Sequence, residues 1–267
     1  MSELSDALRA LRDDGPSPEL EIQAFGGIVP APERGAGSLC LDGFDVSGTV
    51  GPVPWARRAE RIALVAEGRV YLVAREDVEI RPGANLAGEE RDTVVIDRAS
   101  AHAADRLSPN SLLLRGALVR VATMAGALER LAAIAIAHAS ERVQFGRPIG
   151  RFQAVQAHLV TIAQQAALVG VAADAAAARE QAFEIAAAKL LANRAAVAAG
   201  RAAHQVLGAR GVTLEHPLSL ETRRLWSWRS EFGDERYWAK RLGAAAVHAG
   251  ADRLYPAITA GSSELEV

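Results

Sequence analysis

Three arginines lie close together in a short segment that interrupts a long apolar region. Residues 141–153 read ERVQFGRPIGRFQ, so Arg142, Arg147 and Arg151 are separated by two glycines and a proline. Two glycines and a proline within five residues end a helix. Guanidinium groups held at a rigid turn offer a fixed fork of donors to an anion such as a phosphate. We therefore predict a tight, basic, anion-binding turn; the alternative is a solvated connection between two helices.

The residues give few signs of any other chemistry. No cysteine pair or His-x-x-x-His spacing predicts a metal site, and the six histidines are scattered as expected for packed or surface side chains. The sequence has no P-loop and no dinucleotide-binding fingerprint after a strand. A second turn with glycine and arginine, GARG at residues 208–211, ends a later helical segment. The residues alone therefore point to two basic turns.

Long helical segments flank both turns. Alanine and leucine dominate the chain after Pro109, and turn residues divide that region into pieces. The expected helices span residues 112–140, 152–179, 183–207, 218–230 and 234–254, with the join between the second and third near Glu180. Helices joined by short turns form an antiparallel bundle.

The region before the helices has a different pattern. Short β-branched runs predict strands at residues 39–41, 42–46, 61–66, 69–73 and 93–96. The dipeptides Asp42-Gly43 and Glu67-Gly68 are typical of hairpin turns. Strands at this spacing, without helices between them, predict a small antiparallel sheet or a partial barrel.

The predicted fold class is therefore α+β, with a small antiparallel β-domain followed by a C-terminal antiparallel helix bundle. A chain of 267 residues that is half apolar is long enough for two domains. We expect a helical remnant and loop at residues 1–38, the β-domain at 39–108, the bundle at 109–254 and a frayed tail at 255–267.

Composition excludes several classes of function. The formal net charge of −2 provides no basic balance for binding nucleic acid. Cys40 is the only cysteine, which excludes an internal disulfide and favours a cytoplasmic location. The N-terminus has no apolar signal core, and the later apolar runs are interrupted by polar residues, so we expect no membrane span.

The two basic turns together resemble motifs of the acyl-CoA dehydrogenases. RVQFGRPIG at 142–150, followed by FQAVQ at 152–156, is similar to the family's Arg-x-x-Phe-Gly…Phe-Gln signature. HQVLGARGV at 204–212, after AAKL at 187–190, is similar to its Ala-Lys…Gln-x-x-Gly-Gly-x-Gly segment. Weaker matches are EHPL at 215–218 before Arg223, and DGFDVSGT at 42–49. The matches follow the family's order over about residues 30 to 250.

The resemblance implies a fold and a cofactor. Family members have an N-terminal helical domain, a middle β-domain and a C-terminal four-helix bundle, and the first would be largely missing here. They bind FAD, and the adenosine–pyrophosphate end of the cofactor reaches into the helical domain of a neighbouring subunit. By resemblance, the cofactor-binding residues of this chain are Arg142, Gln144, Phe145, Gln153, Gln205, Gly208 and Ala209.

The sequence departs from the family at the catalytic base. The family's base is a glutamate whose position falls on Phe232 here or, in some members, on the first bundle helix at about Gly116. Neither Phe nor Gly can accept a proton. Glu231 is the adjacent carboxylate, and it could replace the base only after a loop shift, because a base must lie within hydrogen-bond reach of its proton.

Two flavin-site loops are also altered. Residues 48–54 read GTVGPVP, without the aromatic and hydroxyl side chains that the family places beside the flavin ring, and Trp55 is out of register. Residues 32–38 keep at best a relic of a second loop.

These losses predict that two different subunits supply different parts of one active site. Groups that one subunit supplies to its own active site are eroded, whereas those for a neighbour's cofactor are kept. We therefore expect a non-catalytic subunit that holds the FAD tail for a homologous full-length acyl-CoA dehydrogenase, in a heterodimer or heterotetramer acting on an acyl-CoA. Such pairs are known in the family, notably in bacterial steroid side-chain breakdown. The alternatives are a stand-alone homodimeric flavoenzyme with Glu231 as a displaced base, and a degenerate, non-enzymatic scaffold.

Overall fold

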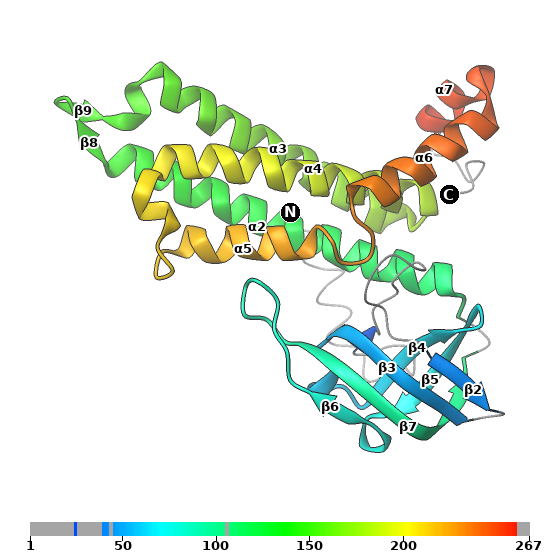
Figure 1. The fold of residues 1–267 in the computed structure, drawn as a ribbon. Coiled ribbons are helices and arrows are strands. Elements are labelled where there is room, and N and C mark those ends of the chain that lie inside the picture. Colours follow the sequence, from blue (N-terminus) through cyan, green and yellow to red (C-terminus); the bar gives the residue numbers. More distant parts are fainter. Residues whose placement is uncertain (1–23, 26–38, 43–44, 105–106, 261–267) are drawn as a thin grey trace. The chain divides into compact units, whose positions relative to one another are not determined.

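The computed structural model describes residues 24–25, 39–42, 45–104 and 107–260. The chain forms two compact units, Met1–Gly116 and Ala117–Val267. The first contains a curled sheet and the second a bundle of helices (Figure 1), which confirms the predicted α+β class. The helix expected near the N-terminus and the loop relic at 32–38 lie outside the described residues.

One mixed sheet forms the first unit. Its strands are ordered β1-β4-β5-β7-β3-β2, with β6 paired to β7. Among the described strands, every pair is antiparallel except β1–β4, which is parallel and was not expected. The strand bounds are β1 Ala24–Phe25, β2 Leu39–Asp42, β3 Asp45–Pro54, β4 Arg61–Ala66, β5 Arg69–Ala74, β6 Glu79–Arg81 and β7 Arg91–Ala103.

The hairpin predicted between β4 and β5 is confirmed. Ala66 pairs with Arg69, and the turn residues Glu67 and Gly68 both have positive φ. This backbone conformation matches the twist of two-residue hairpins, and glycine adopts it at no steric cost.

The expectation of a loop at residues 48–54 is wrong. These residues form most of β3, which pairs with β7 as far as Pro54 opposite Arg91. A register shift between Val50 and Val53 interrupts the side-chain alternation, and this irregularity hides the strand in the sequence. Trp55 follows the strand with φ 51°, and the Arg91 guanidinium carbon lies 5.2 Å from the centre of its ring.

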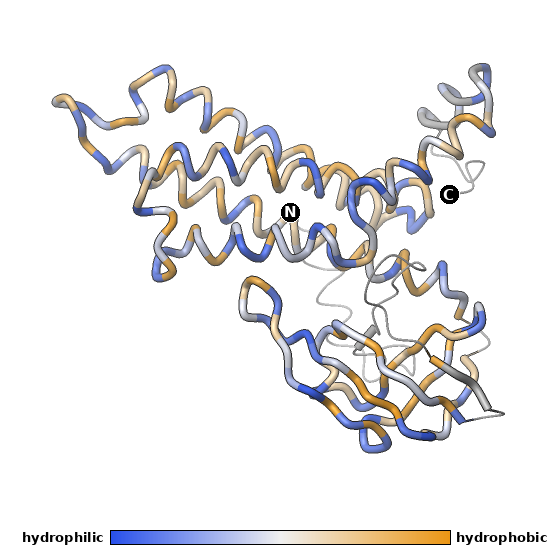
Figure 2. Tube along the Cα trace, viewed as in Figure 1, coloured by the Kyte–Doolittle hydropathy of each residue, from blue (hydrophilic) through white to orange (hydrophobic). Residues whose placement is uncertain are grey.

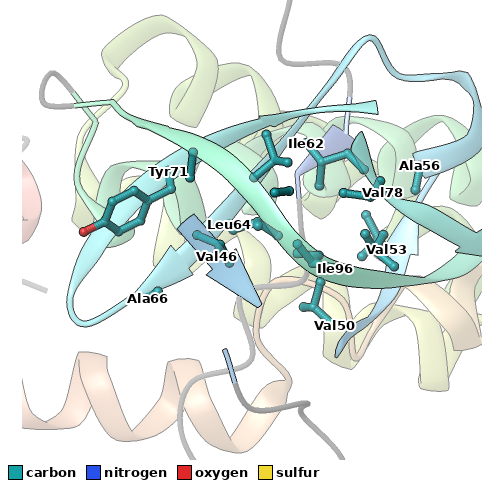
Figure 3. Packing of buried hydrophobic residues seen from close by; sticks show 14 of the residues in the cluster. Val46, Val50, Val53, Ala56, Ile62, Leu64, Ala66, Tyr71, Val78 and Ile96 are labelled. Atoms are coloured by element: carbon teal, nitrogen blue, oxygen red, sulfur yellow. The ribbon is translucent and has the colours of Figure 1, made fainter. Parts of the chain in front are cut away.

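Apolar side chains of these strands fill one core (Figure 3). Successive residues of a strand point to opposite faces, so every second position can face the core. The buried cluster includes Val46, Val50, Val53, Ile62, Leu64, Val73, Val94 and Ile96. Each such side chain stabilises the fold by about 1.5–3 kcal/mol when it is fully buried.

A buried carboxylate fixes one end of this sheet. Asp92 is fully buried and forms a salt bridge with Arg57, whose Nε lies 3.1 and 3.0 Å from its two oxygens. The backbone N–H groups of Gly83 and Arg57 also donate to Asp92. Burial alone would raise the pKa of Asp92, but these hydrogen bonds and the guanidinium charge lower it below its usual value.

The second unit contains the helices and one small hairpin. The elements, starting with the helix that enters the unit, are α2 Pro109–Glu141, β8 Val143–Gln144, β9 Arg147–Pro148, η3 Ile149–Arg151, α3 Gln153–Arg179, α4 Ala182–Leu207, η4 Gly208–Val212, α5 Pro217–Trp228, α6 Glu235–Ala249 and α7 Ala251–Ala260. The expected bundle boundary at residue 109 coincides with the start of α2, whereas the compact units divide farther along that helix.

A two-residue connection, Glu180 and Gln181, joins α3 to α4. Glu180 has φ 51°, and its N–H closes α3 by donating to Ala176, so the predicted join near Glu180 is confirmed. The two helices then pack side by side (Figure 1). Their buried faces are mostly alanine, which lets the backbones approach closely.

The expected last helix and tail are both wrong. Gly250, with φ 78°, ends α6 at Ala249, and α7 continues from Ala251 to Ala260. The sequence predicted one continuous helix because alanine precedes and follows Gly250.

We expected no membrane span because polar residues interrupt the apolar runs, and the length and composition of the helices give only weak evidence on this point. By length and composition alone, α2 and α3 both qualify. The most apolar window of α2 is 56% buried, as expected for a bundle core, but that of α3 is only 28% buried.

Replacing Asp92 with Asn should destabilise the protein by about 2–3 kcal/mol, because it removes the buried charge that Arg57 contacts most closely and leaves the more distant Glu90, 3.9 Å from its Nε. Thermal unfolding followed by circular dichroism measures this loss. Asp97→Asn, at an exposed position of the same strand, is the control and should change the midpoint little. Equal midpoints for the two variants would contradict the assigned role of Asp92.

Candidate functional site

The basic turn at residues 142–151 contains a β-hairpin that was expected only as a turn. Val143 pairs with Pro148 and Gln144 with Arg147. The two residues between them, Phe145 and Gly146, have φ values of 51° and 78°. Two consecutive positive φ values are the signature of a type I′ hairpin turn. The Phe-Gly pair was the sequence signal that could have predicted the hairpin.

Close contacts hold this hairpin against the end of α2. The N–H of Arg142 donates to His138 O at 2.9 Å, and the N–H of Ile149 donates to Arg142 O at 2.8 Å. A Cβ atom on Gly150 would lie 3.1 Å from the carbonyl oxygen of Ala139, so a side chain there would crowd the backbone. The hairpin is thus rigid at its base.

Aromatic contacts order the tip of the hairpin. The guanidinium carbon of Arg147 lies 4.3 Å from the centre of the Phe152 ring, and Phe145 meets the same ring edge-on at 6.0 Å. Phe145 is nevertheless 92% exposed. An ordered, solvent-facing aromatic ring is suited to packing against a ligand or another chain.

The second turn has the open backbone that its glycine predicts. Gly208 ends α4 with φ 59°, and a Cβ built on it would meet nothing within 4 Å. Ala209 and Gln205 are exposed beside it. Gly211, by contrast, is buried, and a side chain there would collide with Leu218. The outer part of the turn is free to approach a ligand, whereas its inner part is packed.

The structure brings both turns to the same end of the bundle (Figure 1). Burial lowers the pKa of His138, and the positive charges of Arg210, His216 and Arg142 lower it further, although Glu141 opposes them. Arg210, His216 and Arg142 therefore all lie close enough to His138 to lower its pKa. Among the described residues, neither Arg142 nor Arg210 has a carboxylate within 4 Å. This end of the bundle thus presents exposed guanidinium groups of the kind that bind anions.

All seven predicted cofactor-binding residues occur in these two turns or directly beside them. They are exposed in this chain: Arg142, Gln144, Phe145, Gln153, Gln205, Gly208 and Ala209. They therefore face outward rather than into the bundle interior, and their role toward a cofactor stays a prediction.

Glu231 is held in an ion pair. The Nε of Arg120 donates to Glu231 Oε2 at 2.6 Å, and the Arg120 side chain is only 2% exposed. The guanidinium also lies 5.7 Å from the Trp228 ring centre and 5.9 Å from that of Phe232. Removing Glu231 would take away the carboxylate that balances this buried guanidinium. The Glu231 carboxylate therefore balances the charge of Arg120, and this structural role competes with a role as catalytic base.

Phe232 is fixed beside it. Phe232 is mostly buried with φ 53°, and its carbonyl oxygen accepts a hydrogen bond of 3.1 Å from Trp238 Nε1. A side chain on Gly233, with φ 95°, would collide with the Trp238 ring. Gly116, the other position at which family members carry a base, is buried in α2. The geometry thus opposes the loop shift that Glu231 would need.

Sequence reasoning included Lys189 in a family match but missed its structural role, which is to hold this loop. It is fully buried, and its Nζ donates to Asn193 Oδ1 at 2.7 Å and to the carbonyl oxygens of Trp228, Arg229 and Gly233 at 3.2 to 3.3 Å. A lone lysine in the alanine-rich stretch 182–207 was the available signal. The ammonium group ties α4 to the end of α5 and to the loop before α6.

The described residues contain no group of three or more His, Cys, Asp or Glu side chains that could hold a metal ion. The end of the bundle that carries the two basic turns presents exposed arginine side chains and the exposed backbone at Gly208.

Comparison with known proteins decides the family. Residues 109–234 match the model of the acyl-CoA dehydrogenase C-terminal domain. By its helical unit, the chain belongs to the acyl-CoA dehydrogenase family. Acyl-CoA dehydrogenase IpdE2 of Mycobacterium tuberculosis is 30% identical over 193 residues, which cover 70% of this chain and 55% of that protein. Acyl-CoA dehydrogenase FadE34 of the same organism is 34% identical over 144 residues, 51% of this chain and 20% of that protein.

Solved structures of this family share the fold. A glutaryl-coenzyme A dehydrogenase in complex with glutaryl-CoA is 18% identical, with a TM-score of 0.74 over 85% of this chain and 66% of that chain. The ChsE4–ChsE5 complex of Mycobacterium tuberculosis is 23% identical, with a TM-score of 0.70 over 84% and 66%. The chain spans about half or less of the curated relatives it matches, so activity does not transfer from them directly.

Replacing Lys189 with Met should destabilise the helical unit by about 1–3 kcal/mol, because four buried acceptors lose their shared donor. Thermal unfolding measures the change, and Lys240→Met, at an exposed position of α6, is the control. A Lys189→Met midpoint equal to that of the control would show that the buried ammonium does not hold the loop.

The effect should also depend on pH. Burial lowers the pKa of Lys189 from 10.5 to about 7 in the folded chain. Between these values the unfolded chain binds more protons, so this lysine's contribution to the free energy of unfolding rises with pH. The stability gap between the natural chain and Lys189→Met should therefore widen from pH 7 to pH 9. A constant gap over that range would contradict the lowered pKa.

Proposed function

We propose that this chain is the FAD-tail-binding subunit of a heteromeric acyl-CoA dehydrogenase. Its two basic turns hold the adenosine and pyrophosphate of FAD for a homologous full-length partner, and the partner supplies the base, the flavin-ring site and the acyl pocket. The observation that carries this proposal is the shared end of the bundle where, among the described residues, Arg142 and Arg210 lie without carboxylate partners beside the open backbone of Gly208.

The residues present fit an FAD tail. A pyrophosphate carries negative charge that exposed guanidinium groups can neutralise and orient. The missing side chain of Gly208 leaves room for close approach by an adenosine, and the exposed ring of Phe145 offers an apolar surface. When bound, FAD supplies the two-electron acceptor for α,β-dehydrogenation of an acyl-CoA. The part of this chain is to bind and orient the tail.

The proton-abstracting base is assigned to the partner. Phe232 and Gly116 cannot accept a proton, and Glu231 is committed to the buried Arg120. These features disfavour the alternative of a stand-alone homodimeric enzyme with Glu231 as its base. The fold shared with the ChsE4–ChsE5 complex supports the heteromer, since that assembly contains two differently named chains. A cytoplasmic location is part of the same proposal.

The direct test compares the chain purified alone with the chain co-expressed beside a full-length acyl-CoA dehydrogenase encoded next to it. The flavin absorption spectrum and acyl-CoA turnover are measured for both. We expect flavin and turnover in the co-purified complex, and neither in the lone chain. Flavin and turnover in the lone chain would overturn the proposal in favour of the homodimeric enzyme, and no flavin in either sample would leave a scaffold.

Arg142→Ala should weaken FAD retention in the complex by roughly 1.5–3 kcal/mol, because it removes a charge-assisted contact with phosphate. That range corresponds to about 10- to 150-fold in the dissociation constant, which fluorescence titration of the flavin-free complex resolves. Arg130→Ala, at an exposed position of α2, is the matched control. Equal FAD affinity for both variants would mean that Arg142 is only a surface residue.

Glu231→Gln separates the structural role of this carboxylate from a catalytic one. The variant should lower the unfolding midpoint, because Arg120 loses its charged partner, yet turnover per bound flavin in the complex should stay within about twofold. A loss of turnover of about a thousandfold or more at unchanged flavin content would make Glu231 the base.

A further inference from the structure

The tip of the β8–β9 hairpin needs contacts beyond its own backbone. The hairpin has two residue pairs, and so short a two-stranded ribbon is marginally stable in water by itself. Hydrophilic and hydrophobic residues alternate along it (Figure 2). At the tip, Phe145 adopts a left-handed backbone conformation that a bulky residue seldom takes, and its side chain is 92% exposed. Burial of the Phe145 ring therefore does not offset this strain.

Backbone contacts fix only the base of the hairpin. Gln156 Nε2 donates to Gly150 O at 3.0 Å, just beyond the end of β9. Gly150 also lies so close to the last turn of α2 that a Cβ on it would come within 3.1 Å of Ala139 O. These contacts anchor the residues that follow the second strand, whereas the two turn residues lie at the other end of the strands.

Phe152 provides a fixed aromatic surface beside the hairpin. This residue immediately precedes α3. Its N–H donates to Ile149 O at 3.0 Å, and its carbonyl oxygen accepts a hydrogen bond from Gln156 N at 3.0 Å. Because the backbone of Phe152 is hydrogen-bonded on both sides, its half-buried ring is anchored to the start of a long helix.

The side chain of Arg147 connects the hairpin to this ring. Its guanidinium carbon lies 4.3 Å from the centre of the Phe152 ring, which is a cation–π contact. Phe145 meets the same ring edge-on at 6.0 Å. In the part of the chain that the structure describes, Arg147 has no ion pair and no side-chain hydrogen bond, so the ring is the group that orders it.

We propose that Arg147 and Phe152 are positioning residues for the FAD tail. Their contact holds the hairpin tip, and with it the side chains of Phe145 and Gln144, in the conformation that binds the cofactor. The cofactor then does not have to order the tip on binding, which would reduce its affinity. This inference rests on the proposed FAD role of the two basic turns, and it adds two residues that act through others.

A direct contact between Arg147 and a phosphate is the alternative role for this arginine. The two roles differ in their dependence on Phe152. An arginine that binds phosphate by its charge contributes to affinity whether or not the ring is present. An arginine that acts through the ring contributes nothing once the ring is removed. A double-mutant cycle separates the two roles.

The cycle is measured by fluorescence titration of the flavin-free, co-purified complex with FAD. Arg147→Gln and Phe152→Leu should each weaken FAD binding about two- to fivefold, as expected for an exposed cation–π contact. The double variant should lose no more than the weaker-binding single variant. Phe152→Tyr keeps the ring face and should restore the natural affinity. Arg151→Gln, at an exposed neighbouring position, removes the same charge without a ring contact and should cost less affinity than Arg147→Gln.

Unfolding midpoints are measured for every variant, because a misfolded chain would also lose FAD. Arg147 is exposed, so Arg147→Gln should fold normally even where Phe152→Leu does not. Additive losses in the double variant overturn the proposal, as does an Arg147→Gln loss no greater than that of Arg151→Gln. In both cases Arg142→Ala still weakens FAD binding, so the FAD role stands. If Arg142→Ala also leaves FAD affinity unchanged, the FAD role fails and this inference fails with it.

Discussion

The burial of one ammonium group is the constraint on which the helical unit depends. Lys189 lies in the alanine-rich helix α4, where no water reaches it, so every proton on its nitrogen must find an acceptor inside the protein. Three of the acceptors are carbonyls at the end of α5 and in the loop that follows. The requirement to satisfy one cation therefore fixes the position of a loop 40 residues away in sequence. Asn193, which accepts from the same nitrogen and donates to Gly233, extends this network.

That fixed loop includes the position at which the sequence predicts the loss of the family's base. Its carboxylate, Glu231, balances the buried Arg120, and its aromatic residue, Phe232, is mostly buried next to the same cation. The carboxylate nearest to the family's base position is therefore already paired with a buried cation. The opposite end of the bundle has the reverse character, because its arginines and open glycine face solvent. One unit thus combines a closed structural end with an open, ligand-accessible end.

Much of this arrangement was predictable from local patterns. The turn at residues 142–151 and the Glu67-Gly68 hairpin follow from residue types whose backbone preferences are strong. The join near Glu180 was predicted without a Gly or Pro at that position. The second half of β3 was not predictable, because a register shift breaks the alternation that identifies a strand. The α6–α7 break was missed since its only signal was Gly250 in a run of alanines.

The long-range pairings inside the helical bundle also could not be predicted from sequence patterns. The partners in the Arg120–Glu231 pair are 111 residues apart, and those in the Lys189–Trp228 contact are 39 apart. No periodicity encodes such pairings, because they depend on which helices pack together. The exposed residues of the two basic turns were easier to predict, since each turn has its own local signature. The grouping of both turns at one end of the bundle required the structure.

The two-residue link of Glu180 and Gln181 between α3 and α4 has a consequence for how the chain folds. Because α3 and α4 are adjacent in sequence, their contacts close only a short loop, and this helical hairpin can form early in folding. The contacts of Lys189 with the loop before α6 close about 40 residues and must come later. The ion pair of Arg120 closes a still longer loop. The segment that carries Glu231 and Phe232 is therefore expected to order last during folding.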